Sequence, residues 1–164
     1  MDFKFNRNIK VGKEACRNLM KVEVEALFNW FGLLKDSDES NFKHVEDLFL
    51  KGKLEGLKIL TQRYYRKKGI TVIHAYRWEG NIRKNRVLES WVPDIYDGIY
   101  GHEIVKAELI AKDYAKPRGG IGKLIERDIP VENILFDVTA LSDSYYLDEL
   151  LGVQPQFEIV VINS

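Results

Sequence analysis

The 164-residue chain contains a single cysteine, Cys16. One cysteine cannot form an intramolecular disulfide or supply the several thiolates of a cysteine zinc site, so both are excluded. The three histidines, His44, His74 and His102, lie far apart and lack the spacing of metal ligands. We therefore predict no metal site. The cysteine usage fits a reducing compartment, and we expect the protein to act in the cytoplasm of the cell that makes or receives it.

Long apolar runs and an excess of one charge are also missing. No run approaches the roughly 18 apolar residues of a membrane span, and the basic residues at positions 1–8 are not followed by an apolar stretch, so we expect neither a membrane segment nor a signal peptide. Lys and Arg together number 25, as do Asp and Glu, which gives a formal net charge of zero. A neutral chain argues against a dedicated nucleic-acid binder, although a local basic patch stays open.

Apolar residues recur at helical spacing up to about residue 69. This periodicity predicts helices over residues 12–34, 42–51 and 54–68. The last helix is expected to end at a cationic turn, Lys67 and Lys68, with Gly69 as its cap. We interpret the chain as a single domain in which a helical N-terminal segment, residues 1–69, precedes a β-rich core, residues 70–164.

The β-rich core is interrupted by one predicted helix. Runs of β-branched and aromatic residues predict strands over 70–76, 86–92, 123–127, 133–138 and 157–162. We expect a Tyr/Gly-rich loop over 94–101, a helix over 102–116 and a loop or short helix over 142–152. Strands segregated from a helical N-terminal part predict an α+β fold.

Two segments begin like known functional motifs but lack the residues that would complete them. Pro93-Asp94 begins like a metal-dependent nuclease motif, but Glu103 and Lys106 have the wrong spacing to continue it. The glycine-rich segment 118–122 resembles a phosphate-binding loop, yet no Lys-Ser/Thr pair follows it. We interpret this segment as a turn between a helix and a strand.

A third set of residues is spread over three predicted strands. Arg77 ends the first strand, Ser90 lies in the second, and Gln156 and Glu158 lie at the start of the last. Strand alternation places Gln156 and Glu158 on the same face of the sheet. If the strands converge, the site holds one cation, one hydroxyl, one amide and one carboxylate.

In this order and spacing the sequence resembles the mono-ADP-ribosyltransferases of the Arg–Ser–Glu type. The resemblance covers about residues 70–164 and includes the Gln-x-Glu motif at 156–158, a small-residue helix after the serine and a proline turn at Pro130. It implies an ADP-ribosyltransferase-like two-sheet β core and NAD⁺ as a substrate. It also implies transfer of ADP-ribose to a macromolecular acceptor, as in effectors of the phage or toxin type.

The resemblance also implies residue roles. Glu158 would stabilise the ribosyl cation and Gln156 would contact the acceptor, which in this family goes with a non-arginine residue. Arg77 would hold the pyrophosphate and Ser90 would orient Glu158. The aromatic side chains proposed to contact the cofactor beside them are Tyr76 and Trp91, with Trp78, Tyr96 and Tyr100 as further candidates for stacking. The second hydroxyl of the family's serine segment is replaced by Val92.

Other interpretations stay open. Arg77 can be a strand-end cation paired with Glu79 or Glu89, and Ser90 and Glu158 can be solvated strand residues. The chain can be a non-catalytic protein that inhibits a host protein by surface contact, or a transferase fold that binds NAD⁺ or nucleic acid without turnover. Two observations distinguish these alternatives: whether Arg77, Ser90 and Glu158 lie together, and whether the protein consumes NAD⁺.

Overall fold

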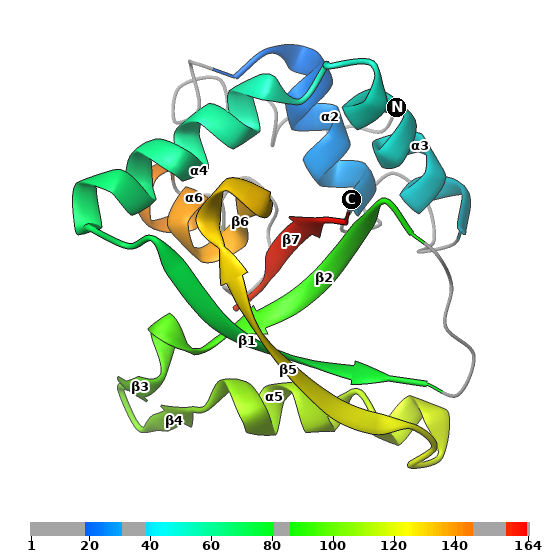
Figure 1. Ribbon diagram of the computed structural model, residues 1–164, viewed down its shortest axis with the longest axis vertical. Helices are drawn as coiled ribbons and strands as arrows, with labels where there is room; N and C mark the ends of the chain where they lie inside the picture. The colour runs from blue at the N-terminus through cyan, green and yellow to red at the C-terminus, as the bar shows by residue number, and fades with distance from the viewer. Residues whose placement is uncertain (1–18, 31–38, 81–85, 146–156, 164) are drawn as a thin grey trace. The chain divides into compact units, whose positions relative to one another are not determined.

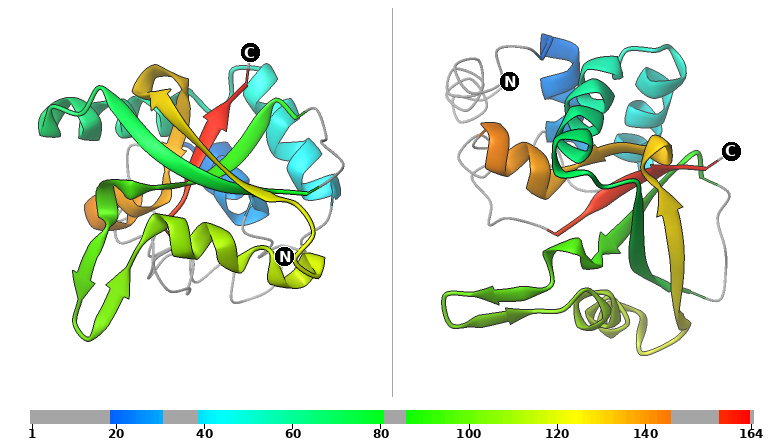
Figure 2. Two further views of the ribbon diagram at one scale, coloured as in Figure 1. Left: turned by 60° about the horizontal axis from the view of Figure 1, so that its bottom comes forward. Right: turned by 60° about the vertical axis from the view of Figure 1, so that its left-hand side comes forward.

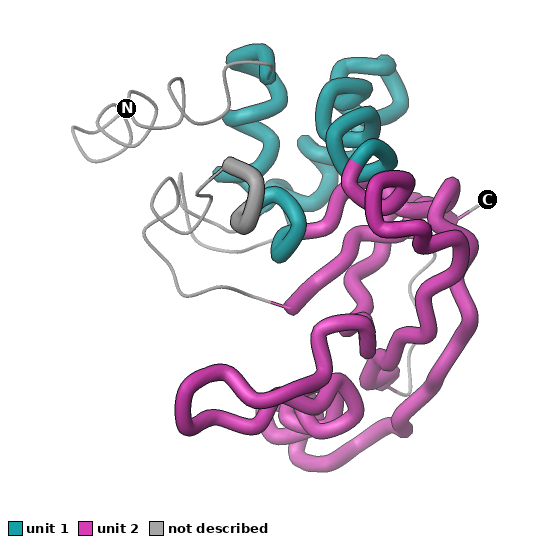
Figure 3. The backbone as a smooth tube through the Cα atoms, turned by 90° about the vertical axis from the view of Figure 1, so that its left-hand side faces the viewer, with its two compact units in different colours: residues 1–63, 138–156 teal, residues 64–137, 157–164 magenta. Residues whose placement is uncertain are grey.

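A computed structural model of the chain describes residues 19–30, 39–80, 86–145 and 157–163 (Figure 1). The chain divides into two compact units, coloured separately in Figure 3. Residues 1–63 and 138–156 form one, which we call the helical unit, and residues 64–137 and 157–164 form the other, the sheet unit. The division falls a few residues before the predicted change at position 69, and the chain returns to the helical unit at Val138.

Amphipathic segments build the helical unit. Its helices are α2 (Lys21–Trp30), α3 (Glu39–Leu50), most of α4 (Glu55–Lys68) and α6 (Val138–Tyr145). Apolar residues at helical spacing on α2, among them Leu27 and Trp30, are buried, and the Trp30 ring meets Phe42 of α3 edge-on at 4.9 Å between centroids. The helix predicted over residues 12–34 is thus present over Lys21–Trp30, and its remainder falls largely outside the described residues.

The end of α4 follows the predicted capping chemistry. Gly69 has a φ of 69°, a left-handed conformation that glycine adopts without the steric cost of a Cβ atom. The Gly69 N–H donates to the carbonyl of Arg66 at 3.1 Å, and the Ile70 N–H donates to that of Tyr65 at 2.9 Å. These bonds satisfy carbonyls at the end of the helix, so the predicted glycine cap is confirmed.

The strands of the sheet unit form an antiparallel sheet and a separate hairpin. In the described part of the chain the five-stranded sheet has the order β5-β1-β2-β7-β6, and the hairpin pairs β3 with β4. The α+β class is therefore confirmed. The strands are β1 (Val72–Glu79), β2 (Leu88–Pro93), β3 (Gly98–Tyr100), β4 (Glu103–Val105), β5 (Lys123–Pro130), β6 (Ile134–Asp137) and β7 (Ile159–Ile162).

Alternating side chains give the sheet two apolar faces. On one face a buried cluster contains Tyr65, Ile73, Ala75, Trp91, Ile129, Ile134, Ile159 and Val161. On the other face, Val92 packs against Ala107 and Ala111 of α5 (Ala107–Asp113), with Tyr76 and Phe157 at the edge of the contact. α5 lies against β1 and β2, and Figure 2 shows it on one side of the sheet. Small residues on α5 allow its backbone to approach the sheet.

The segment before α5 departs from the prediction. A helix was expected over residues 102–116, but Glu103–Val105 pairs with Gly98–Tyr100 as a β-hairpin, and the helix is confined to Ala107–Asp113. The hairpin forms because Gly101 takes a φ of 65° in its two-residue turn. The Asp97 carboxylate accepts the Ala107 N–H at 2.8 Å, which fixes where the helix begins. The loop expected over 94–101 is correspondingly wrong for residues 98–100.

Short 3-10 turns join the remaining elements. They are η1 (Asp94–Tyr96), η2 (Lys116–Arg118) and η3 (Val131–Asn133). After η2, Gly119 and Gly120 have φ values of 62° and 76° and reverse the chain into β5. The interpretation of segment 118–122 as a turn from a helix to a strand is confirmed.

Candidate functional site

Arg77 lies where β1 and β2 stop pairing. The two strands are in register at Ala75 with Pro93 and at Tyr76 with Val92, whereas β1 continues to Glu79. The sequence predicts Arg77 at the end of the first strand. In the structure Arg77 lies inside the strand. Its Nη1–H group donates to the backbone carbonyl of Ser90 at 2.8 Å. This bond links the two strands beyond their paired stretch and places the guanidinium beside the Ser90 backbone.

The Ser90 hydroxyl and the Glu158 carboxylate are joined directly. Ser90 lies opposite Val160 in the β2–β7 register, and Glu158, two residues before Val160, extends to the same face of the sheet. The Ser90 Oγ–H group donates to Glu158 Oε1 at 2.6 Å in a partly buried position. Glu158 itself immediately precedes β7, which begins at Ile159. The Ser90 hydroxyl and the Glu158 carboxylate thus meet on one face of the sheet. Arg77 alternates to the face of Glu89 and Trp91, and it reaches Ser90 through the backbone carbonyl.

A buried carboxylate lies next to the guanidinium. Glu89 Oε2 is 3.8 Å from Arg77 Nε, and Glu89 Oε1 accepts the indole N–H of Trp91 at 2.9 Å. Glu89 is buried, whereas Arg77 keeps part of its side chain exposed. Of the two partners that the sequence left open for Arg77, the structure gives Glu89 this contact. The buried negative charge of Glu89 attracts the guanidinium and favours this position of it.

The other predicted site residues are placed differently. Trp91 is buried in the cluster on the sheet face opposite Ser90, and the guanidinium of Arg127 lies 4.9 Å from its ring centroid. The structure therefore makes Trp91 a core residue and does not bring it to the Ser90 side chain. Tyr76 is opposite Val92 and partly buried against α5, so it shares the face of Ser90. Gln156 lies outside the described residues.

Aromatic residues from other elements pack against the residue before Glu158, and a further one senses the charge of Glu158. The ring of Phe157, the preceding residue, lies 6.0 Å from that of Tyr96 and 5.5 Å from that of Tyr100. Tyr114, at the end of α5, is 55% exposed, yet desolvation and then the charge of Glu158 raise the pKa of its phenol. No motif marks Tyr114, because its proximity to Glu158 arises from the packing of α5 on the sheet.

A second group of charges lies on β1 and β5. His74 Nδ1 is 2.6 Å from Asp128 Oδ1, and His74 Nε2 is 3.2 Å from Glu126 Oε2. The hydrogen bond to Asp128 is the main reason that the pKa of His74 is raised above 6.5, and Glu126 adds to it. Among the described residues, no group of three or more His, Cys, Asp or Glu side chains is arranged to hold a metal ion.

This histidine gives the stability of the sheet unit a pH dependence. Because the pKa of His74 is higher in the folded than in the unfolded chain, its stabilisation is complete below 6.5 and is lost as the pH rises through the raised value. We expect the urea concentration at the midpoint of unfolding to decrease as the pH is raised from about 6 to about 9. His74→Asn should remove this decrease. Urea titrations of both proteins across this range measure the effect. Parallel profiles would contradict it.

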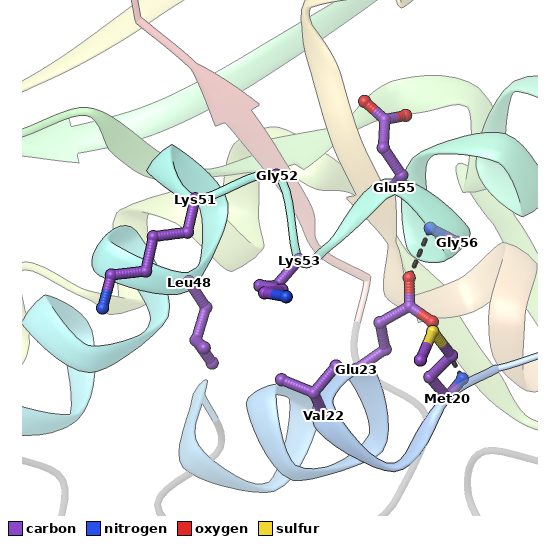
Figure 4. Close-up of a pocket in the computed structure, with 9 residues that line it drawn as sticks. All are labelled: Met20, Val22, Glu23, Leu48, Lys51, Gly52, Lys53, Glu55 and Gly56. Atoms are coloured by element: carbon purple, nitrogen blue, oxygen red, sulfur yellow. Dashed lines mark hydrogen bonds between the residues drawn. The ribbon is translucent and has the colours of Figure 1, made fainter.

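The helical unit contains a pocket of about 750 Å³ (Figure 4). It is lined by Met20, Val22, Glu23, Leu48, Lys51, Gly52, Lys53, Glu55 and Gly56. The carboxylate of Glu23 is committed to the fold, because it accepts the backbone N–H of Gly56 at the start of α4 and that of Met20 before α2, the latter at 2.9 Å. A negative charge is favourable at the start of a helix. We therefore interpret Glu23 as a structural cap of both helices.

Removal of this cap is expected to destabilise the helical unit. Glu23→Ala leaves the Met20 and Gly56 N–H groups without their acceptor and should lower the free energy of unfolding by about 1–3 kcal/mol. Glu23→Gln keeps one carbonyl oxygen and should lose about half as much. Urea denaturation followed by circular dichroism measures both. The control is Glu25→Ala, which removes only the surface pair with Lys21, and a loss for Glu23→Ala no larger than this control would contradict the assignment.

The sheet unit thus joins the Ser90 hydroxyl to a carboxylate that could stabilise a developing cation, and it bonds a guanidinium that could bind a phosphate to the Ser90 backbone. Comparison of the chain with protein-family models, with curated proteins and with solved structures finds no match. Within the stretches that the structure describes, none of the helices combines the length and the apolar character needed to cross a bilayer.

Proposed function

We propose that the chain is a mono-ADP-ribosyltransferase with an ADP-ribosyltransferase-like fold, and that the sheet unit binds NAD⁺. One observation carries the proposal. Arg77 on β1, Ser90 on β2 and Glu158 before β7 are joined by a hydrogen bond from Arg77 to the Ser90 carbonyl and by one from the Ser90 hydroxyl to Glu158. The resemblance in sequence assigns roles to the same three residues.

Arg77 binds the pyrophosphate of NAD⁺ in this proposal. Contacts to Glu89 and to the carbonyl of Ser90 orient the guanidinium. A guanidinium has five N–H donors in one plane, so it can keep these contacts and donate further bonds to a phosphate. Lysine has no such planar arrangement of donors and would not reproduce them.

Glu158 stabilises the sugar as nicotinamide leaves. The bond between ribose C1′ and the nicotinamide nitrogen breaks, and its electron pair goes to the nitrogen, which becomes neutral. Positive charge then develops on the ribose, and the Glu158 carboxylate stabilises it through the field of a fixed negative group and a hydrogen bond from the 2′-hydroxyl. The acceptor atom next bonds to C1′ and releases its proton. With water in place of the acceptor, the same steps hydrolyse NAD⁺.

Ser90 orients Glu158 in this proposal, and its hydroxyl does so without the second hydroxyl that the family has. Val92, at the position of the family's second hydroxyl, is buried against Ala107 and Ala111. Its side chain supports the packing of α5, where a hydroxyl would need a hydrogen-bond partner. The Ser90 hydroxyl already donates to the carboxylate, so the orienting function needs only this one group.

The acceptor is proposed to be a protein side chain other than arginine. This part of the proposal comes from Gln156 in the Gln-x-Glu motif, since an amide has no charge with which to pair an arginine acceptor. The cytoplasm of the producing or target cell, where NAD⁺ is available, is the proposed site of action. A nucleic-acid acceptor is an alternative that the experiment distinguishes.

The experiment combines equilibrium dialysis against labelled NAD⁺ with transfer of the label to lysate proteins. We expect saturable binding that ADP-ribose displaces, and a labelled protein band that withstands denaturation. Binding without transfer or NAD⁺ consumption would favour a transferase fold that has lost turnover. If the wild-type chain neither binds NAD⁺ nor labels any of several lysates, the non-catalytic binding protein becomes the better account.

A further inference from the structure

The β3–β4 hairpin exposes an unusual pair of apolar side chains. Ile99 and Ile104 are cross-strand partners, and their side chains are 76% and 74% exposed. Figure 2 shows the hairpin extending beyond the five-stranded sheet in both views. Adjacent exposed isoleucines form an apolar patch that the fold of the sheet unit does not require, and such patches mark interaction sites.

Ring contacts and hydrogen bonds hold the hairpin against Phe157, the residue before Glu158. The Tyr100 ring lies 5.5 Å from that of Phe157, the residue before Glu158, and the Tyr100 hydroxyl donates to the carbonyl of Tyr96 at 2.9 Å. At the base of the hairpin, the Asp97 carboxylate accepts the N–H of Ala107 at 2.8 Å. These contacts fix the hairpin against the segment that carries Glu158, so a molecule held on the hairpin is near that segment.

The charge of this region selects the kind of partner. Between residues 94 and 108 the chain has four carboxylates, Asp94, Asp97, Glu103 and Glu108, and one lysine, Lys106. A surface with this excess of negative charge repels the phosphates of a nucleic acid, whose binding depends on lysine and arginine contacts. A protein surface with an apolar centre and basic residues around it is complementary to both features.

We infer that the β3–β4 hairpin docks the protein acceptor of the proposed transferase. Ile99 and Ile104 bury their side chains in an apolar depression of the acceptor, and basic residues of the acceptor lie near the carboxylates of residues 94–108. The inference rests on the proposed function and specifies its partner. It assigns acceptor selection to an element distinct from Arg77, Ser90 and Glu158, so docking and NAD⁺ chemistry are separable by substitution.

The test compares two double variants with the wild-type chain. Ile99→Ser/Ile104→Ser removes the apolar pair, and Val72→Ser/Ile121→Ser changes two other exposed apolar residues, 52% and 55% exposed, as the matched control. Label transfer from NAD⁺ to lysate proteins is measured beside the release of nicotinamide without lysate. We expect the hairpin variant to lose transfer about tenfold or more, since each buried isoleucine contributes appreciably to binding, and to release nicotinamide at the wild-type rate. The control should retain both activities.

Each other outcome overturns the docking role. Wild-type transfer by the hairpin variant, an equal loss in the control, or a parallel loss of nicotinamide release would each contradict it while leaving the proposed function in place. Label recovered in nucleic acid would contradict the choice of partner. A wild-type chain that releases no nicotinamide and transfers no label would instead contradict the proposed function, and the docking role with it.

Discussion

Replacing Glu158 by alanine is expected to lower nicotinamide release and label transfer together, by about 10²- to 10³-fold, the typical effect of deleting a positioned electrostatic stabiliser. NAD⁺ should still bind, because Arg77 makes the ground-state contact with the pyrophosphate. Glu158→Gln is the sharper variant. An amide oxygen can still accept the bond that the Ser90 hydroxyl now donates to Glu158, but it has no charge, so we expect a loss as large as that of Glu158→Ala.

The control for this pair is Glu132→Ala, which removes an exposed carboxylate from η3 in the same unit. Initial rates of nicotinamide release and dialysis with labelled NAD⁺ separate catalysis from binding. Glu158→Gln with near wild-type rates would mean that orientation and not charge is the contribution of this residue. Loss of NAD⁺ binding in both Glu158 variants would contradict the division of roles between Glu158 and Arg77.

Asp137→Ala is expected to have the largest effect on stability. The buried Asp137 Oδ2 accepts the hydroxyl of Tyr65 at 2.5 Å and that of Tyr96 at 2.8 Å. Burial, and next the charge of Asp137, raise the pKa of both phenols, so both remain protonated donors. The alanine variant leaves two hydroxyls without this acceptor and should lower the free energy of unfolding by about 2–4 kcal/mol.

Single substitutions measure how much each hydrogen bond to Asp137 contributes to stability. Tyr65→Phe and Tyr96→Phe each remove one donor and should cost less than Asp137→Ala, and Asp137→Asn, which keeps an acceptor oxygen, should also cost less. Urea denaturation of these variants gives the coupling energies. Asp113→Ala, which removes an exposed pair with Lys116, is the control. An Asp137→Ala chain no less stable than this control would contradict a structural role for the network.

Local signals predicted much of the fold. The cationic turn and Gly69 predicted the end of α4, and runs of β-branched residues predicted the strands. The ends of the strands, however, depend on pairing with strands elsewhere in the chain. The first strand was expected to end at Tyr76, where its β-rich composition ends, but it continues because β5 pairs with it as far as Glu79 opposite Lys123. The hairpin at 98–105 escaped prediction because Ile99 and Ile104 are paired and exposed, which produces no amphipathic pattern.

The site was accessible from sequence only in part. The motif order singled out Arg77, Ser90 and Glu158, but the contact of Ser90 with Glu158 depends on the register of β2 against β7, which a single sequence does not specify. Trp91 was proposed as a cofactor contact although it follows Ser90 directly. Strand alternation sends adjacent side chains to opposite faces, and Trp91 is buried away from the Ser90 hydroxyl.

The measurement that tests the central claim most directly is the rate at which the purified wild-type chain releases nicotinamide from NAD⁺. The account predicts steady release above the spontaneous rate, and release about 10²- to 10³-fold slower for Glu158→Ala at the same protein concentration. A wild-type rate that equals both the Glu158→Ala rate and the rate without protein, with and without lysate present, would contradict the assignment of Arg77, Ser90 and Glu158 to NAD⁺ chemistry.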